Sequence, residues 1–242
     1  MLSKNELKYI KSLSHKKHRD EEKLFIAEGP KLAEEILKSD FTIKHVYATK
    51  EWLSKHSSIA APATEISEAE LTNISNLQTA NEVLVIAEQK ILSKEPLLPN
   101  NITLALDGIQ DPGNFGTIIR IADWFGLKQI VASEDSVEEY NSKVVQSSMG
   151  SICRVDVWYK DLQQWIEQTN IPVYGALLNG QTVYELKNIK EGLLVMGNES
   201  KGIREPLKFK ITHPVTIPKV GGAESLNAAV ATGIIVGCMV NS

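Results

Sequence analysis

The chain has 242 residues, of which 43% are hydrophobic and 23% charged, and its formal net charge is −4. This composition is ordinary for a soluble globular protein, and the length allows one large domain or two smaller ones with buried cores. No apolar run is long enough to span a bilayer, and the N-terminal residues carry Lys and Glu where a signal peptide needs an apolar core. We therefore expect a cytoplasmic protein with no membrane partner.

The N-terminal part alternates short helices and strands. Pro30 directly follows Gly29, which favours a helix start at the proline. A stretch rich in Pro and Asn, residues 89–101, separates this part from the rest of the chain. We expect helices at about 4–13, 30–39 and 67–75, and strands at 23–29, 43–49 and 81–88. The pattern predicts a small α/β domain over residues 1–95.

Residues 8–19, KYIKSLSHKKHR, contain no acid and five cationic side chains, namely Lys8, Lys11, Lys16, Lys17 and Arg19. A basic patch on an acidic body can bind phosphate groups by releasing counterions. The alternative is a solvated helix face whose charge is balanced by the DEEK segment that follows.

The second part, residues 100–242, alternates strands and helices more strongly. Strands are expected at 102–107, 129–133, 154–159, 172–178, 192–197 and 213–218, and helices at 115–125, 138–149, 161–168, 204–209 and 226–240. Near-continuous apolar strands separated by helices predict a parallel sheet covered on both faces. Ligands of such sheets bind in loops beyond the carboxyl ends of the strands. Three such loops are rich in Gly and polar residues: 107–116, 197–202 and 218–227.

The first loop, DGIQDPGNFGT, leads into a helix that carries Arg120. Asn114 is a suitable N-cap for this helix. A guanidinium beside a helix N-terminus can bind a phosphate with two hydrogen bonds. The alternative is a surface pair of Arg120 with Asp123 or Asp107.

The other two loops are MGNESKGI and IPKVGGAESLN. In the first, Gly197 and Gly202 are expected to leave backbone amides free for a ligand, while Glu199 and Lys201 could neutralise each other. In the second, Ser225 is expected to cap an apolar, buried helix. Small residues on that helix admit another backbone closely, either neighbouring loops or a second subunit: Ala228, Ala229, Gly233 and Gly237.

Asn227 falls in the first turn of this predicted helix and needs a hydrogen-bond partner there. It could be a functional residue or a satisfied core asparagine. Cys153 and Cys238 form no ligand pattern, so we expect free, buried thiols. The sequence has no phosphate-binding G-x-x-x-x-G-K motif, no G-x-G-x-x-G dinucleotide motif and no G-x-S-x-G nucleophile motif. Its five histidines lack metal-ligand spacing, so no metal is expected.

Three segments in order resemble motifs 1, 2 and 3 of the SpoU (TrmH) family of RNA 2′-O-ribose methyltransferases, of the SPOUT class. The segments are DPGNFGTIIRIADWFG, LLVMGNESKGI and IPKVGGAESLNAAVATGI. The N-terminal LFIAEGPKLAEEIL is similar to the L30e-like substrate-binding domain common in this family. The resemblance implies an RNA-binding domain over residues 1–95 and a catalytic α/β domain with a trefoil knot over residues 100–242.

The resemblance also implies S-adenosyl-L-methionine as cofactor, a homodimer and a set of site residues. The cofactor would be held largely by backbone groups of Leu177, Gly197, Ile217 and Leu226. The catalytic positions of the family would fall on Asn114, Arg120, Glu199, Ser225 and Asn227.

Two roles stay open for Arg120 within this family pattern. It could pass on the proton of the ribose 2′-OH with the help of an RNA phosphate, or it could only orient the hydroxyl and the phosphate. A guanidinium titrates above about 12 and is a poor base, which favours orientation. The expected substrate is 23S ribosomal RNA; transfer RNA is the alternative, and a non-catalytic RNA-binding protein of the same fold is a third hypothesis.

Overall fold

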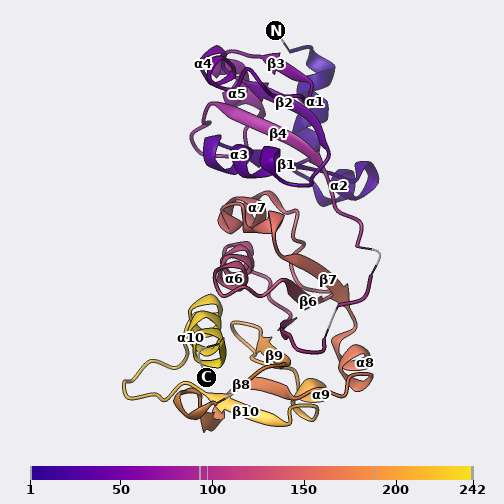
Figure 1. Ribbon diagram of the computed structural model, residues 1–242. Helices are drawn as coiled ribbons and strands as arrows, with labels where there is room; N and C mark the ends of the chain where they lie inside the picture. The colour runs from indigo at the N-terminus through magenta and orange to yellow at the C-terminus, as the bar shows by residue number, and fades with distance from the viewer. Residues whose placement is uncertain (1, 93, 97, 188, 241–242) are drawn as a thin grey trace. The chain divides into compact units, whose positions relative to one another are not determined.

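The computed structural model describes residues 2–92, 94–96, 98–187 and 189–240. The chain forms two compact units (Figure 1). The N-terminal unit comprises Met1–Ile91 and Glu138–Cys153, and the C-terminal unit comprises Leu92–Val137 and Arg154–Ser242. The predicted ranges 1–95 and 100–242 differ from these units in two respects. The C-terminal unit begins at Leu92, and residues 138–153 group with the N-terminal part.

The N-terminal unit is built on a four-stranded sheet. Its strands are β1 (Leu24–Glu28), β4 (Val83–Glu88), β2 (Ile43–Ala48) and β3 (Ala63–Glu65), in that spatial order. The β4 strand is antiparallel to both β1 and β2, whereas β2 and β3 are parallel. Its helices are α1 (Lys4–Ser12), α2 (Lys16–Glu22), α3 (Pro30–Lys38), α4 (Lys50–Lys55), α5 (Glu68–Ile74) and α7 (Ser142–Ser148).

The alternation of side chains along β1 and β4 creates a hydrophobic core on each face of this sheet. Leu24 and Ile26 belong to the cluster that includes residues of α1 and α5. Phe25 and Ala27 belong to the cluster that includes residues of α3, α4 and α7. Both faces of the sheet are therefore buried, which explains why all five residues of β1 are inaccessible to solvent.

The segment 138–153, which connects β6 and β7 of the C-terminal unit, completes the second of these cores. The ring of Tyr140 lies 4.8 Å from that of Phe25 and 6.4 Å from that of Phe41, and its hydroxyl accepts a hydrogen bond from the backbone N–H of Lys90. Glu138 forms an ion pair with Arg19 of α2. The N-terminal unit is therefore assembled from two separate stretches of the chain.

The burial of Arg19 corrects the predicted basic patch. Only 2% of this residue is exposed, and its guanidinium donates to the carbonyls of Leu13 and Ser14 as well as to Glu138. The four lysines of the stretch are exposed. The exposed positive charge over residues 8–19 therefore comes from the four lysines and not from Arg19.

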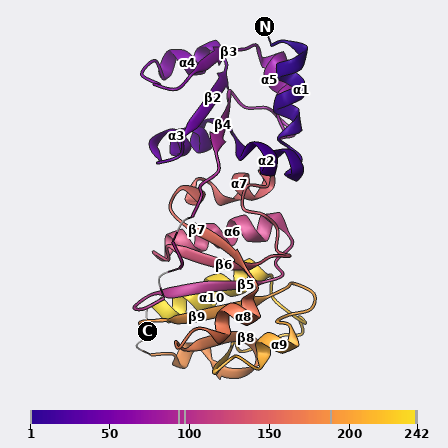
Figure 2. The same cartoon turned by 90° about the vertical axis from the view of Figure 1, so that its right-hand side faces the viewer.

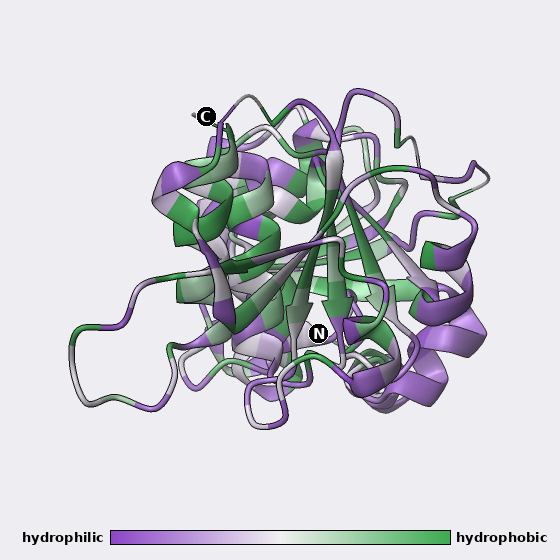
Figure 3. Ribbon diagram, turned by 90° about the horizontal axis from the view of Figure 1, so that it is seen from below, coloured by the Kyte–Doolittle hydropathy of each residue, from purple (hydrophilic) through white to green (hydrophobic). Residues whose placement is uncertain are grey.

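The C-terminal unit contains a parallel six-stranded sheet, as predicted (Figure 2). The strands, in spatial order, are β10 (His213–Thr216), β8 (Val173–Thr182), β9 (Gly192–Gly197), β5 (Ile102–Asp107), β6 (Gln129–Ser133) and β7 (Asp156–Lys160). The strands are mostly hydrophobic, whereas many loops are hydrophilic (Figure 3). After β5 the chain forms β6 and then β7 on one side of β5, whereas β9 pairs with the other side of β5. The strand order therefore reverses at the β5–β9 pair.

Four α-helices belong to this unit: α6 (Pro112–Trp124), α8 (Leu162–Glu167), α9 (Glu205–Lys208) and α10 (Ala228–Val240). Residues of α8 and α9 join one core cluster with the strands. The α6 and α10 helices pack against each other. An added Cβ at Gly237 of α10 would lie 3.2 Å from Phe125, and one at Gly233 would lie 3.6 Å from Ile121. The small residues of α10 therefore admit α6 of the same chain.

Several predicted bounds change. The sequence analysis missed α2, α4 and β3, which are short and lack a clear apolar period. The helix predicted at 138–149 is α7, and it is shorter because residues 138–141 form turns before the N-cap Asn141. Among the described residues Cys153 and Cys238 form no disulfide, and both are half-buried, not fully buried as expected. Within the described residues, the structure contains no helix with both the length and the apolar character that a bilayer crossing needs.

We expect Tyr140→Ala to lower the free energy of unfolding of the N-terminal unit by roughly 3–5 kcal/mol, because it empties an aromatic site in that unit's core. Hydrogen exchange of the β1 backbone amides under native conditions measures this change. Tyr184→Ala is the matched control, since 67% of Tyr184 is exposed and its loss costs about 0.5 kcal/mol or less. Equal protection of β1 in the two variants would show that the 138–153 segment does not stabilise this unit.

Candidate functional site

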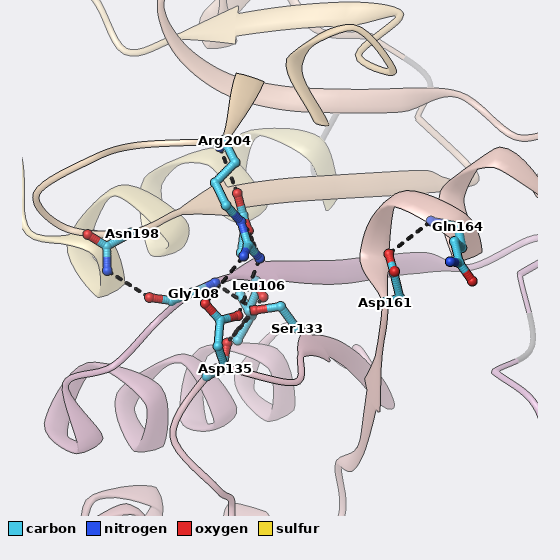
Figure 4. A network of polar contacts seen from close by, with 10 residues as sticks. Leu106, Gly108, Ser133, Asp135, Asp161, Gln164, Asn198 and Arg204 are labelled. Carbon is cyan, nitrogen blue, oxygen red and sulfur yellow. Dashed lines mark hydrogen bonds and ion pairs between the residues drawn. The ribbon is translucent and has the colours of Figure 1, made fainter. Parts of the chain in front are cut away.

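A buried acid closes β5 at the point where the strand order reverses. Asp107 is the last residue of β5 and is 1% exposed. Its carboxylate accepts hydrogen bonds from the backbone N–H of Arg204, at 2.8 Å, and from the Arg204 guanidinium. Figure 4 shows Arg204 within the surrounding polar network. A buried carboxylate needs such partners because its removal from water is costly. The pair ties the segment that follows β9 to the end of β5.

The same guanidinium reaches a second acid. Its Nη1 and Nη2 atoms each lie 3.3 Å from an oxygen of Asp135. A hydrogen bond from Ser133 and the charge of Arg204 lower the pKa of Asp135. Burial by itself lowers the pKa of Arg204, but Asp107 and Asp135 together raise it above its ordinary value. Ser133 Oγ also accepts a hydrogen bond of 2.8 Å from the backbone N–H of Gly108.

The loop after β9 is held in a tight turn by Asn198. Its Nδ2 donates to the carbonyl of Gly108 at 2.7 Å, and its Oδ1 accepts the backbone N–H groups of Ser200 and Lys201. Two backbone hydrogen bonds between Asn198 and Gly202 close the turn. The prediction that this loop leaves its amides free for a ligand is therefore wrong for Ser200, Lys201 and Gly202.

Gly197 is required by the close approach of this turn to β9. An added Cβ at Gly197 would lie 2.2 Å from the carbonyl carbon of Gly202 and from the backbone nitrogen of Ile203. Gly202 itself has a φ of +68°, a conformation that glycine adopts without strain. Both glycines of the motif are thus explained by backbone packing.

Three predicted catalytic residues from three distant segments form one hydrogen-bond chain. Asn227 Nδ2 donates to Asn114 Oδ1 at 2.8 Å, and Asn114 Nδ2 donates to Glu199 Oε1 at 2.9 Å. Asn114 lies in the first turn of α6, Glu199 in the turn after β9, and Asn227 directly before α10. The alternative pairing of Glu199 with Lys201 is not formed among the described residues.

The helix caps differ from those predicted. The N-cap of α6 is Asp111, whose carboxylate accepts the N–H of Asn114, and Pro112 occupies the first turn. The amide of Asn114 is thereby left available for the hydrogen-bond chain. The helix predicted to start at Leu226 starts at Ala228, and its N-terminal amides, those of Ala229 and Val230, are accepted by Asn227 Oδ1.

These caps change the interpretation of two predicted residues. Ser225 is an exposed loop residue and is not the cap. Asn227 is not buried inside the helix either, because it caps the helix with its oxygen and binds Asn114 with its nitrogen.

Arg120 lies in the third turn of α6 and is exposed. It does not pair with the acids considered for it: Asp123 binds Arg154, and Asp107 binds Arg204. Among the described residues, its guanidinium has no hydrogen bond or ion pair. Arg120 is not part of the chain formed by Asn114, Glu199 and Asn227, and its donors are free to bind a ligand.

Three of the four predicted cofactor contacts lie on or directly next to adjacent strands of the sheet. Gly197 ends β9, and Ile217 directly follows β10. Leu177 lies just beyond the residues of β8 that pair with β9, where the register between β8 and β10 shifts. Because these three strands are adjacent and parallel, Gly197 and Ile217 lie at neighbouring carboxyl ends, and Leu177 lies where the pairing of β8 with β9 ends. Leu226, 49% exposed, precedes α10.

Sequence reasoning missed the roles of Asp107, Asn198 and Arg204. A cavity of about 400 Å³ opens beside this network, lined among others by Asp135, Arg204 and Asp161. None of the predicted site residues lines it. The available signal was an acid at the end of an otherwise apolar strand. In the part of the chain that the structure describes, no three His, Cys, Asp or Glu side chains group as metal ligands do.

Comparisons with known sequences extend over both units. Residues 101–237 match the SpoU rRNA Methylase family, and residues 4–85 match the MRM3-like substrate binding domain. The chain is 31% identical over 231 residues to the 23S rRNA (guanosine(2553)-2′-O)-methyltransferase RlmP of Bacillus subtilis, an alignment that covers 93% of this chain and 92% of that protein. It is 29% identical to the 23S rRNA (guanosine-2′-O-)-methyltransferase RlmB of Haemophilus influenzae, over 66% of this chain and 67% of that protein.

Solved structures agree with these matches. A TrmH-family protein from Porphyromonas gingivalis superposes with a TM-score of 0.87 at 36% identity, covering 99% of this chain and 98% of that one. An AdoMet-bound rRNA methyltransferase from Sinorhizobium meliloti superposes with a TM-score of 0.87 at 29% identity, covering 100% of this chain and 96% of that one. The fold, the motifs and the match over more than half of its length show that this chain belongs to the SpoU rRNA methylase family.

Proposed function

We propose that the protein transfers a methyl group from S-adenosylmethionine to a ribose 2′-OH of 23S ribosomal RNA. The observation that carries this proposal is the hydrogen-bond chain Glu199–Asn114–Asn227, because it joins the three motif segments of the family at one place in the fold. The names of the relatives from Bacillus subtilis and Haemophilus influenzae support the ribosomal substrate over transfer RNA.

Residues 100–242 form the proposed catalytic domain and hold the cofactor. Leu177, Gly197 and Ile217 fit this role because they bring backbone groups to three adjacent strands, at or near the points where strand pairing ends, and Leu226 adds an exposed apolar side chain. The structure of the Sinorhizobium meliloti relative contains the same cofactor. The cofactor, when bound, supplies an electrophilic methyl group on a sulfonium, so the task of the protein is to align the ribose oxygen with it.

Arg120 is proposed to orient the ribose hydroxyl and the neighbouring phosphate. Its exposure and its lack of protein partners among the described residues support this role, since all of its donors are available. A guanidinium that titrates above about 12 is a poor proton acceptor, so an orienting role explains more than a role as general base. Asn114, Glu199, Ser225 and Asn227 are proposed to shape the surrounding site.

Residues 1–95 are proposed to bind the RNA, and the match to a substrate-binding domain supports this assignment.

We further propose a homodimer that buries the outer surface of α6 and α10. Trp124 is 85% exposed and Val230 is 52% exposed on these two helices, and such apolar surface favours a protein interface. The proposed substrate places the protein in the cytoplasm.

We expect Arg120→Ala to lower kcat for methyl transfer by roughly 100-fold or more, the usual effect of removing one positioned donor from an active site. The KM for S-adenosylmethionine should stay unchanged. Transfer of a labelled methyl group to total RNA measures both, with Arg154→Ala as the control that removes the same charge from the same unit. If Arg120→Ala were as active as the control, Arg120 would have no catalytic role. If the wild type and both variants were all inactive, the non-catalytic RNA-binding alternative would be favoured.

Asn227→Asp and Asn227→Ala separate the two tasks of Asn227. Aspartate can still cap α10 but cannot donate to Asn114, whereas alanine does neither. We expect both variants to lose activity by at least tenfold, and only Asn227→Ala to lose about 1 kcal/mol of stability. Thermal unfolding and methyl transfer are measured on the same samples. Full activity of Asn227→Asp would contradict a functional hydrogen-bond chain.

Gly197→Ala is expected to abolish binding of S-adenosylmethionine, because the new methyl group would force the turn 198–202 away from β9. Isothermal calorimetry with the cofactor measures this loss. Gly221→Ala is the control, since a Cβ at Gly221 meets nothing within 4 Å. Wild-type affinity in Gly197→Ala would remove this turn from the cofactor site.

A further inference from the structure

A second cavity lies wholly within the N-terminal unit. Its volume is about 400 Å³, within the range of about 300–1,000 Å³ typical of small-molecule sites. Leu24, Tyr47 and Ile86 of β1, β2 and β4 line its inner part and are buried. Tyr9 of α1 and Glu22, the last residue of α2, line it from the helices. The cavity therefore opens between one face of the sheet and two helices, with an apolar floor.

Tyr47 carries an unpartnered polar group in this cavity. Only 6% of the residue is exposed, and among the described residues its hydroxyl has no hydrogen-bond partner. The hydroxyl is not among the buried polar atoms that lack a partner, so it is open to the cavity. It is therefore available to bind water or a ligand there.

The cavity is also rich in aromatic rings. The rings of His45 and Tyr47 lie 4.4 Å apart between centroids, and Tyr9 is 41% exposed at the rim. Burial lowers the pKa of His45, and burial raises the pKa of Tyr47. Burial and the nearby Glu22 raise the pKa of Tyr9. The rings are therefore uncharged near neutral pH. Tyr9 is exposed and His45 is half-buried, so these two rings can stack on an unpaired nucleobase.

The charges in the cavity argue against a phosphate. Glu22 and Glu88 contribute two negative charges and Lys44 one positive charge, which leaves −1. Lys44 is moreover bound to Glu88 at 2.6 Å. A phosphate would be repelled, whereas a base with N–H donors finds acceptors here. Guanine suits this set best, because its N1–H and N2–H groups can both bind one carboxylate and its O6 can accept from a hydroxyl.

We propose that this cavity binds one unpaired guanine base of the RNA substrate, stacked against the aromatic rings, with Glu22 accepting from the Watson–Crick edge and the Tyr47 hydroxyl donating to it. This inference rests on the proposed function, since it requires an RNA substrate. It adds a base-reading contact in the N-terminal unit, separate from the residues proposed for methyl transfer.

The test uses the full chain and fluorescein-labelled RNA stem-loops with identical stems and loops that differ in one central nucleotide. Fluorescence anisotropy at one fixed salt concentration gives the Kd of each. We expect the wild-type protein to bind the guanine loop roughly tenfold more tightly than the uracil loop, a ratio that one bidentate contact supplies. Glu22→Gln, which replaces one acceptor oxygen by a donor, should reduce this preference to less than about twofold. Tyr47→Phe, which removes only the hydroxyl, should weaken binding of the guanine loop by about fivefold.

Glu51→Gln is the matched control. It removes the same charge from α4 of the same unit, where Glu51 binds Lys55 outside the cavity, and it should keep the wild-type preference. Hydrogen exchange of the β1 backbone amides in every variant identifies any folding defect of this unit. Free guanosine should compete with the guanine loop and a lysine-rich peptide should not; the reverse pattern would assign the cavity to a basic protein segment and overturn the proposal.

The two proposals fail in distinguishable ways. Two results would overturn the guanine site and leave the proposed function intact. In the first, the wild-type protein methylates RNA but binds the guanine and uracil loops equally. In the second, the cavity variants keep the guanine preference. Wild-type protein that neither binds the stem-loops nor methylates RNA would overturn both.

Discussion

The site depends on the pairing of one buried carboxylate. Asp107 ends a central strand and is removed from water, so its charge must be balanced by groups that reach the same place. Arg204 provides a backbone N–H and a guanidinium, and Asn198 adds a hydrogen bond to the neighbouring Gly108. These contacts fix the turn after β9 against β5. Glu199 lies within that turn and can therefore reach Asn114 on α6.

The N-terminal unit has a comparable dependence on a distant segment. Residues 138–153 come from the connection between two strands of the C-terminal unit, yet Tyr140 fills an aromatic cluster with Phe25 and Phe41. Arg19, which is almost completely buried, binds Glu138 of the same segment. A buried cation without this partner would be strongly destabilising.

The differences between the sequence analysis and the structure have physical reasons. Asp111 and Asn114 are both good capping residues. Asp111 is the cap, and Pro112 follows it at the first helical position, where its missing N–H costs nothing. Asn227 lies directly before the apolar run of α10, where a first-turn residue and a cap look alike in sequence. Helix α2 is short and highly charged, so it has no apolar period from which it could be predicted. Its only buried residue is Arg19. The trefoil knot implied by the family resemblance remains a prediction.

By itself, the sequence determined the order of most strands and helices, the parallel α/β class and the family to which the chain belongs. These features depend on side-chain periodicity and motifs that span a few neighbouring residues. Only the tertiary structure decided that Glu199, Asn114 and Asn227 share one hydrogen-bond chain, that Arg204 binds Asp107, and that Tyr47 lines a cavity. Such contacts join residues tens to more than a hundred positions apart, and they form only when strand order and helix packing bring those positions together.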